Sequence, residues 1–310
     1  DMFGMRAAAG NFTVPEIFEA VAYTHAHGAR AYLTVNTMPR TAEYPALRDY
    51  LTALRGSGID ALIVSDLGVL ETAKELLPEA ELHISTQASS VSAADVRAWR
   101  ALGASRVVLA RELTLDEVAE IVRDVPDTEI ECFVHGAMCI SYSGRCLLSN
   151  FLVGRDANQG SCTHPCRWKY SIVEESRPGE YMPVYENERG TYIFNSKDLC
   201  MIEHMDDILT SGIDSLKIEG RMKTALYVAT VARTYRKAID DYLEDPAKYQ
   251  ANMSWYQEQI AGCTYRKFTT GFFYGKPSEE AQIYDNNNYE KGYTYLGFAE
   301  AVDERGYVQI

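Results

Sequence analysis

The pattern of apolar and polar positions predicts alternating helices and strands along most of this chain. Residues 14–28 carry apolar side chains at helical spacing, with Pro15 in the first turn and Gly28 at the end, which is typical of a helix. Residues 30–36 form a short apolar run that indicates a buried strand. The same helix-then-strand order repeats, with helices predicted at 44–59, 67–78, 92–104 and 114–126 and strands at 60–66, 81–87, 105–112 and 128–136.

The pattern is interrupted after residue 136 and resumes near residue 191. The elements predicted there are a strand at 191–195, a helix at 199–213, a strand at 214–220 and a long amphipathic helix at 222–246. Residues 293–310 look like two strands joined by a turn that contains Asp303 and Gly306. We expect the long helix to bury its apolar residues at three- and four-residue spacings, namely Met222, Leu226, Ala229, Ala232, Tyr235, Ile239 and Tyr242.

Short connections between apolar strands predict repeated strand–helix units around a parallel sheet. A (β/α)₈ barrel has eight strands and begins with one, whereas this region opens on a helix. We therefore expect an α/β protein with a TIM-like but incomplete (β/α) barrel at residues 1–250, carrying a cysteine-rich insertion at about 137–190. Residues 251–310 are predicted to be a Tyr-rich extension and the start of a small, truncated C-terminal β domain. A doubly wound open sheet is the alternative, but no Gly-rich fingerprint follows a first strand.

Composition and charge narrow the class of protein. Apolar residues make up 46% and charged residues 24% of the chain, as in ordinary globular proteins. No membrane span or secretory signal is visible, and an odd number of seven cysteines favours a reducing compartment, so we predict a cytoplasmic protein. The net charge of −14 argues against a general nucleic-acid binder. Only residues 141–240, where basic and acidic groups balance, could host a phosphate-binding patch.

Four of the cysteines, Cys139, Cys146, Cys162 and Cys166, lie close together in the chain. Thiolates bind zinc or iron, and the loops rich in Gly, Ser and Asn between them suit a cluster whose sulfurs accept hydrogen bonds from backbone N–H groups. Cys200, at the start of a predicted helix, is a further candidate ligand. Metal or cluster binding is therefore predicted, with zinc as the lesser alternative.

The remaining cysteines and histidines carry simpler interpretations. Cys132 lies within a predicted strand and Cys263 lies far along the chain, so both are expected to be core thiols. A catalytic Cys–His pair that uses His135 or His164 is a weaker possibility, because isolated nucleophilic cysteines do not occur in fours.

Polar residues gather at the predicted strand ends, where parallel barrels place their active sites. Asp66 is explained as a helix cap, and Asn36 ends the first predicted strand. Three cations converging on one end suggest a small anionic ligand held by Arg forks. We expect this ligand to be bound by Arg111, Lys217, Arg221 and Gln87, with Glu112, Glu219 and His135 as candidate catalytic groups. The alternative is that Lys217 and Arg221 only pair with Glu219 or Glu112 as a structural network.

Residues 131–170, 194–200 and 215–239 closely resemble the collagenase-like peptidase family U32. The match includes an E-x-F-x-x-G-A-x-C segment at 131–139 followed by G-x-C-x-x-S at 144–149, and it extends over almost the whole chain. Within the family the chain is most similar to the branch that hydroxylates the tRNA wobble uridine with prephenate as co-substrate. Family members begin with a strand–helix–strand unit before the segment around residues 5–13, and the resemblance therefore implies that this unit is missing here.

The resemblance also implies a function and a cofactor. The expected reaction is prephenate-dependent hydroxylation of tRNA wobble uridine to 5-hydroxyuridine, with tRNA and a small anionic co-substrate as partners. A collagenase-like peptidase is the alternative, but no His-Glu-x-x-His or Gly-x-Ser-x-Gly motif is present. By similarity to relatives, a four-iron four-sulfur cluster, replaceable by zinc in air, is expected on Cys139, Cys146, Cys162 and Cys200, with Cys166 as the alternative ligand.

Overall fold

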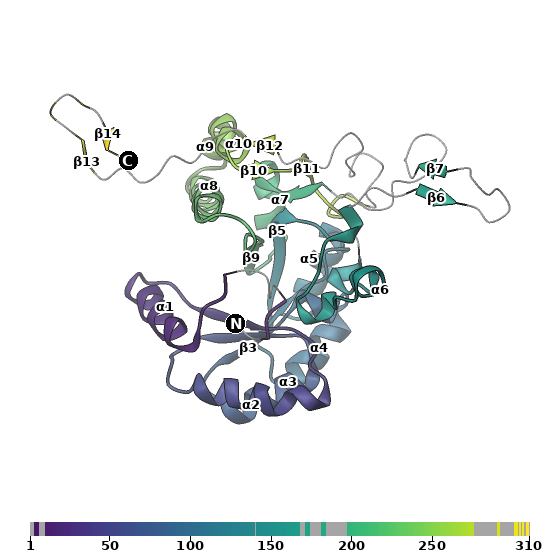
Figure 1. Cartoon of the computed structure of the whole chain (residues 1–310). Coiled ribbons are helices and arrows are strands. Elements are labelled where there is room, and N and C mark those ends of the chain that lie inside the picture. The colour runs from purple at the N-terminus through teal and green to yellow at the C-terminus, as the bar shows by residue number, and fades with distance from the viewer. Residues whose placement is uncertain are drawn as a thin grey trace.

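The computed structural model describes residues 3–5, 10–139, 141–167 and 197–275, and short segments at 171–173, 181–183, 290–291, 301–302, 304, 306 and 308–309. Figure 1 shows the strands of the main sheet in the centre of the molecule with helices arranged around them. The predicted division into regions at residue 250 stays a prediction.

Helix and strand alternate through the first part of the chain, as the pattern predicted. The elements are α1 (Val14–Ala26), β1 (Tyr32–Val35), η1 (Thr41–Glu43), α2 (Tyr44–Ala53), β2 (Ala61–Val64), α3 (Leu67–Leu76), β3 (Glu81–Ile84), η2 (Thr86–Ala88), α4 (Ala93–Ala101), β4 (Arg106–Val108), α5 (Leu115–Asp124) and β5 (Glu129–Ala137). Side-chain caps begin several of these helices: Asp66 accepts a hydrogen bond from the Val69 N–H at 3.1 Å, and Thr114 and Glu117 form the predicted capping box.

The main sheet is mostly parallel. Strands β1 to β5 lie in sequence order, and β9 (Ser215–Ile218) pairs in parallel with β5. The C-terminal part of β5 also pairs antiparallel with β8 (Asp198–Cys200), which in turn pairs in parallel with β11 (Phe268–Thr269). The predicted α/β architecture is therefore confirmed in its coarse form.

The predicted barrel is not confirmed, because the described strands form an open sheet. Strand β1 pairs only with β2, and β9 pairs only with β5, so the two edges do not meet. Arg221, which follows β9, donates a hydrogen bond of 2.7 Å from Nη1 to Thr34 Oγ1 of β1, so a side-chain contact bridges these two edges. The strand predicted at 191–195 lies outside the described residues.

The cysteine-rich region consists of short elements. They are η3 (Tyr142–Gly144), α6 (Leu148–Val153), η4 (Ala157–Gln159), η5 (Pro165–Arg167) and the antiparallel pair β6 (Ser171–Val173) and β7 (Tyr181–Pro183). The helix predicted at 199–213 is wrong at its start, since Leu199 and Cys200 belong to β8 and pair with β5. Only η6 (Ile202–His204) and α7 (Met205–Thr210) are helical there.

The remaining elements are α8 (Ala225–Glu244), α9 (Pro246–Ala251), α10 (Met253–Ala261), β10 (Thr264–Tyr265), β12 (Glu290–Lys291), β13 (Ala301–Val302) and β14 (Val308–Gln309). Strands β13 and β14 pair antiparallel across the predicted turn, of which Gly306 is described and Asp303 lies outside the described residues. The predicted core stripe of the long helix is partly wrong. Met222, Leu226, Ala229 and Ala232 are exposed, whereas Tyr235 is buried and Ile239 and Tyr242 pack against the core. The helix instead buries Tyr227, Val231, Thr234, Tyr235, Ala238 and Asp241.

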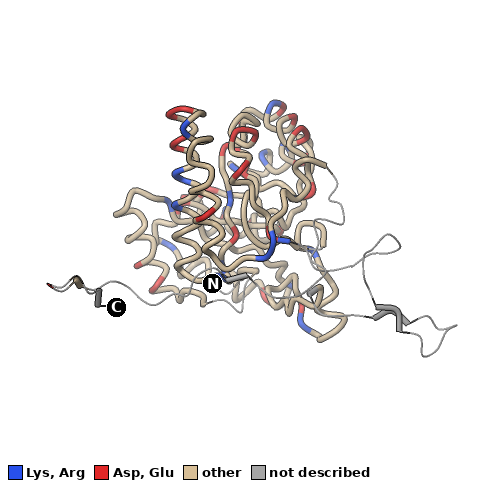
Figure 2. Tube along the Cα trace, turned by 90° about the horizontal axis from the view of Figure 1, so that it is seen from above, with Lys and Arg blue, Asp and Glu red and all other residues tan. Residues whose placement is uncertain are grey.

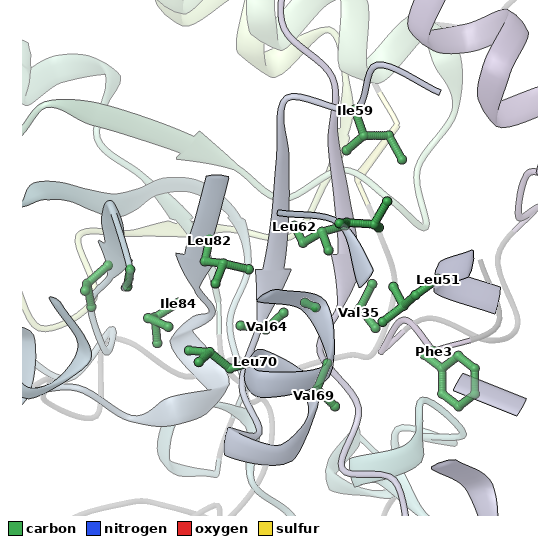
Figure 3. Packing of buried hydrophobic residues seen from close by; sticks show 14 of the residues in the cluster. Phe3, Val35, Leu51, Ile59, Leu62, Val64, Val69, Leu70, Leu82 and Ile84 are labelled. Atoms are coloured by element: carbon green, nitrogen blue, oxygen red, sulfur yellow. The ribbon is translucent and has the colours of Figure 1, made fainter. Parts of the chain in front are cut away.

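Alternate residues of the central strands face opposite sides of the sheet. Leu62 and Val64 of β2 pack into the hydrophobic core against the helices, whereas Ile63 between them lines a cavity on the other side. Figure 3 shows the core side chains of β1, β2 and β3 meeting Leu51 of α2 and Leu70 of α3. Each fully buried aliphatic side chain of this kind contributes about 1.5–3 kcal/mol to stability. The helices thus hold one face of the sheet, and the other face is left for a site.

Figure 2 shows that Lys and Arg are interspersed with Asp and Glu along the described part of the chain. No described helix is long and apolar enough to cross a membrane.

Candidate functional site

Four cysteines line one cavity of about 140 Å³ at the end of strand β5. Cys139 follows β5, Cys146 lies between η3 and α6, Cys162 follows η4, and Cys166 belongs to η5. All seven cysteines of the chain lie within the described residues, and none of them forms a disulfide. An engineered cavity of about 150 Å³ in another protein binds benzene. The cysteine cavity therefore has room for a small group.

Backbone amides point at the sulfur atoms of this cysteine cavity. The Leu148 N–H lies 3.4 Å from Cys146 Sγ, and the His164 N–H lies 3.3 Å from Cys162 Sγ. Burial raises the pKa of the Cys139 thiol, and this effect is opposed by the Ser141 N–H and by the charge of Arg111. Such hydrogen bonds stabilise negative charge on sulfur and are a feature of protein iron–sulfur sites.

Cys200 lies at the same end of the sheet as Cys139 but outside the lining of the cysteine cavity. It is opposite His135 in the β5–β8 ladder, and its Sγ lies 3.9 Å from the Tyr235 hydroxyl. Burial raises the pKa of the Cys200 thiol to about 11. The structure therefore brings together three of the four predicted ligands and the alternative ligand Cys166.

The other two cysteines are core thiols, as predicted. Cys132 is 4% exposed and Cys263 is 7% exposed, and each belongs to a hydrophobic cluster.

The cysteine cavity differs in geometry from a site for one ion. Among the described residues, no three Cys, His, Asp or Glu side chains come close enough together to share a single metal ion. In a four-iron cluster each thiolate binds a different iron atom, so the sulfurs surround a group rather than a point. Four thiols around a cavity, with N–H groups directed at two of them, fit such a cluster.

A second cavity of about 200 Å³ lies on the inner face of the sheet at the strand ends. Three cations line this strand-end cavity: Arg111 follows β4, Lys217 lies within β9, and Arg221 follows β9. Asn36 from the end of β1 lines it as well, and its Nδ2 donates to Ser85 Oγ at 3.1 Å. The parallel direction of the strands explains why residues so far apart in the chain meet here.

Each of the three cations also has partners within the protein. Arg111 Nη1 donates to the Ala137 carbonyl at 3.1 Å, and its guanidinium lies 3.8 Å from the centre of the Phe133 ring. Arg221 donates to Thr34 Oγ1 and to Asn11 Oδ1, both at 2.7 Å. Burial lowers the pKa of the Arg221 guanidinium, although Glu219 opposes this.

Lys217 belongs to a buried ionic network. Its Nζ lies 2.6 Å from Glu131 Oε1, and Arg106 Nη1 lies 3.1 Å from the other carboxylate oxygen. Burial raises the pKa of the Glu131 carboxyl, but Lys217, Ser215 and Arg106 together hold that pKa below its usual value. Lys217 thus has a structural role, but its partner is Glu131 and not the expected Glu219 or Glu112. The same side chain lines the strand-end cavity.

The two cavities share a wall. Gln87, Arg111 and Glu219 line both of them, together with Thr86 and Met5. Gln87 is only 8% exposed, and its Oε1 atom has no hydrogen-bond partner among the described residues. A buried acceptor of this kind favours a ligand with an N–H or O–H donor, because leaving it unpaired costs about 1–3 kcal/mol.

The three candidate catalytic groups lie in different environments. His135 is 1% exposed, lines neither cavity, and has its pKa lowered to about 3 by burial and by the charge of Lys223. Glu112 accepts hydrogen bonds from the Ser143 N–H at 2.6 Å and the Ser143 hydroxyl at 2.7 Å, so it positions the η3 loop. Only Glu219 lines the cavities.

Some residues that shape the site were missed from the sequence. Glu131 and Phe133 alternate along β5 with the core residue Cys132. This alternation is the sequence signal that places their side chains on the face of the sheet opposite to Cys132. Tyr235 was expected only as a core residue, yet its hydroxyl donates to the Val134 carbonyl, accepts from the Met201 N–H and lies 3.3 Å from His135 Nδ1. Its partners are remote in sequence, so no local pattern indicates this role.

Comparison with known proteins identifies the family of this chain. The family model "Peptidase family U32" matches residues 1–283. The "tRNA hydroxylation protein P1" of Bacillus subtilis is 40% identical over 97% of this chain and 71% of its own length. The "tRNA hydroxylation protein P" of Escherichia coli is 38% identical over 97% of this chain and 73% of its own length. An uncharacterized protease of Methanocaldococcus jannaschii is 38% identical over 87% of this chain and 65% of its own length. The chain therefore belongs to peptidase family U32.

Proposed function

We propose that this chain hydroxylates tRNA, converting the wobble uridine to 5-hydroxyuridine in the cytoplasm, with prephenate as co-substrate. The observation that carries the proposal is the pair of adjoining cavities, one lined by four thiols and the other by three cations, with Arg111 in the shared wall. The names of the similar Bacillus and Escherichia proteins support the reaction class. The resemblance to the wobble-uridine branch supports the target and the co-substrate.

The cysteine cavity is the proposed binding site of a four-iron four-sulfur cluster. Cys139, Cys146 and Cys162 would hold it, with Cys200 or Cys166 as the fourth ligand. A bound cluster supplies one-electron redox chemistry. The N–H groups of Leu148 and His164 would stabilise the charge on the cluster sulfurs.

The strand-end cavity is the proposed site of the anionic co-substrate. A carboxylate there gains charge-assisted hydrogen bonds from the guanidinium groups of Arg111 and Arg221, which match its geometry as forks. Arg111 is held by its stacking on Phe133, so little side-chain entropy is lost when the ligand binds. Gln87 and Glu219 would orient the donor groups of the ligand at the shared wall.

A peptidase is the second candidate, and the name of the Methanocaldococcus relative favours it. A Cys–His mechanism would require a histidine that can exchange a proton with a thiol near neutral pH. His135 is buried against Tyr235 with a pKa lowered to about 3, which makes it unsuited to this role. His164 lines the cysteine cavity and is the remaining histidine for such a mechanism.

Complementation tests the proposal. The chain is produced in a bacterial strain that lacks its own tRNA uridine hydroxylases, and tRNA nucleosides are analysed by mass spectrometry. We expect 5-hydroxyuridine to appear with the chain and to be lost when prephenate synthesis is blocked. A peptidase would leave the tRNA unmodified and would release fragments from denatured collagen.

A further inference from the structure

Helix α6 exposes apolar side chains beside the cysteine cavity. Leu147, just before the helix, is 74% exposed, and Phe151 is 83% exposed. The Phe151 N–H donates to the Leu147 carbonyl at 2.9 Å, so the two side chains are neighbours on one face of the helix. Tyr142 of η3 is 52% exposed. Figure 1 shows α6 at the periphery of the molecule.

The opposite side of α6 is tied to the cysteine cavity. Ser149 is fully buried, and its Oγ lies 2.9 Å from Thr163 Oγ1 and accepts from the Thr163 N–H at 3.1 Å. Thr163 directly follows Cys162, and Leu147 directly follows Cys146, both of which line the cavity. The exposed apolar face is therefore held at a fixed place on the rim of the proposed active site.

The charge around α6 differs from that of the whole chain. Residues 141–167 contain three arginines and one acidic residue, Asp156, in a protein whose net charge is −14. Arg145 and Arg155, which flank the helix, are both exposed, and Arg145 Nε also donates to the Gln87 carbonyl at 2.8 Å. A basic segment with exposed aromatic rings in an acidic protein is complementary to a polyanion that carries flat bases.

We propose that Tyr142, Arg145, Leu147, Phe151 and Arg155, here called the α6 platform, dock the single-stranded loop of the RNA substrate. A loop base stacks on Phe151, and the flanking arginines contact phosphates. Sequence-specific RNA recognition uses unpaired bases stacked on aromatic side chains, and a wobble uridine lies in such a loop. This inference rests on the proposed function, because it names the surface that delivers the RNA to the cysteine cavity. The arginines favour RNA over an apolar protein partner.

Fluorescence anisotropy with a labelled RNA hairpin, whose loop contains uridine, tests the platform. We expect Phe151→Ala to weaken binding by about 5- to 100-fold, the cost of losing one base–aromatic stack. Phe151→Trp should restore binding, since stacking needs only an aromatic face. Arg155→Ala should reduce the slope of log K against log salt by about 0.7. The control variants are Tyr23→Ala on α1 and Arg123→Ala on α5, both highly exposed at 68% and 72%, and both should bind normally.

Two readouts separate the possible failures. Unchanged hairpin affinity in Phe151→Ala would overturn the platform. If Phe151→Ala has a melting temperature several degrees below that of the wild type, or a different oligomeric state, then Phe151 packs against protein and not against RNA. That result would overturn the platform as well. If hairpin binding depends on Phe151 but the wild-type chain leaves cellular tRNA unmodified, the platform stands and the hydroxylation proposal fails. Hydroxylation that is normal in both wild type and Phe151→Ala leaves the hydroxylase standing without the platform.

Discussion

The guanidinium of Arg111 lies 3.8 Å from the centre of the Phe133 ring, in the wall that separates the two cavities. Arg111 follows β4, and Phe133 lies on the neighbouring strand β5. The stacking and the hydrogen bond to the Ala137 carbonyl together set the direction of the guanidinium. Arg111 is therefore the cation that can contact ligands in both cavities, because Lys217 and Arg221 line only the strand-end cavity.

Loss of this aromatic contact should weaken co-substrate binding. Replacing Phe133 by Leu removes the ring beneath Arg111, a contribution of about 0.5–2 kcal/mol, while keeping an apolar side chain of similar volume. We expect the prephenate concentration needed for half-maximal hydroxylation to rise about 2- to 30-fold. Phe268→Leu is the control, because Phe268 stacks on Tyr265 and lines neither cavity. Equal effects of the two substitutions would contradict a specific role for Phe133.

Cysteine variants test the proposed cluster through metal content. Iron and acid-labile sulfide are measured in anaerobically purified protein. Replacing Cys139, Cys146 or Cys162 by Ser should remove most of the iron, because each supplies a thiolate to the cavity. Cys263→Ser should keep it, since Cys263 is buried in a hydrophobic cluster and does not line the cysteine cavity.

The same measurement identifies the fourth ligand. Of Cys166→Ser and Cys200→Ser, the variant that lacks the true ligand should lose iron and the other should retain it. Cys166 lines the cavity, whereas Cys200 lies 3.9 Å from the Tyr235 hydroxyl. Full iron content in both variants would contradict a four-cysteine site that includes either residue.

Gly136 should be needed for the close approach of β5 and β9. A side-chain Cβ at this position would lie 2.4 Å from the Glu219 carbonyl oxygen, and the backbone φ of +110° is unfavourable for other residues. We expect Gly136→Ala to lower the free energy of unfolding by about 3 kcal/mol or more, measured by urea titration. Gly28→Ala is the matched control, with a positive φ but open space around it, and should cost about 1 kcal/mol. Similar costs for both would contradict the steric explanation.

Asp241 on α8 should stabilise the helical region in a pH-dependent way. Its Oδ2 lies 2.7 Å from Lys237 Nζ and accepts from the Tyr256 hydroxyl at 2.5 Å, and its Oδ1 lies 3.0 Å from Lys248 Nζ. Burial raises the pKa of the Asp241 carboxyl, but these partners outweigh it and hold the pKa well below the usual value of 3.8. Asp241→Asn should lower the free energy of unfolding by about 2 kcal/mol at neutral pH. Asp240 is exposed, so Asp240→Asn should lower it by less than about 0.5 kcal/mol.

The sign of the pH dependence follows from this lowered pKa. The contribution of Asp241 is fully present above the unfolded-state pKa of about 3.8 and is lost as the pH falls through the lower folded-state pKa. The difference in the free energy of unfolding between wild type and Asp241→Asn, measured by urea titration, should therefore be constant from about pH 8 to 5. It should shrink below about pH 4. A difference that shrinks between pH 8 and 6 would show that another group is responsible.

Local periodicity was sufficient to predict the elements of the first half of the chain. The helix with the Thr114–Glu117 capping box and the buried strands such as β2 depend on neighbouring residues only. Pairing between distant segments was not predictable in this way. The antiparallel ladder that places Cys200 opposite His135 depends on residues far apart in sequence, and it converts the start of a predicted helix into a strand. Helix α8 has apolar residues on more than one side, so its sequence did not determine which side faces the core.

The site was predictable to the extent that it follows from strand direction. Arg111, Lys217 and Arg221 were expected together because parallel strands end on one side, and all three line one cavity. The partners of these cations depend on the register between β4, β5 and β9, which the sequence pattern does not specify. The pairing of Lys217 with Glu131 and the stacking of Arg111 on Phe133 are therefore findings of the structure.

The most direct test of the central claim is the fraction of 5-hydroxyuridine in tRNA from the complemented deletion strain when Arg111 is replaced by Lys. Lysine keeps the charge but loses the fork and the planar stacking on Phe133. The account predicts a folded protein, produced at the wild-type level, whose hydroxylation falls about 10- to 100-fold, while Arg123→Lys on the exposed side of α5 is unaffected. Full hydroxylation with both Arg111→Lys and Arg221→Lys would contradict the claim that the adjoining cavities form one active site.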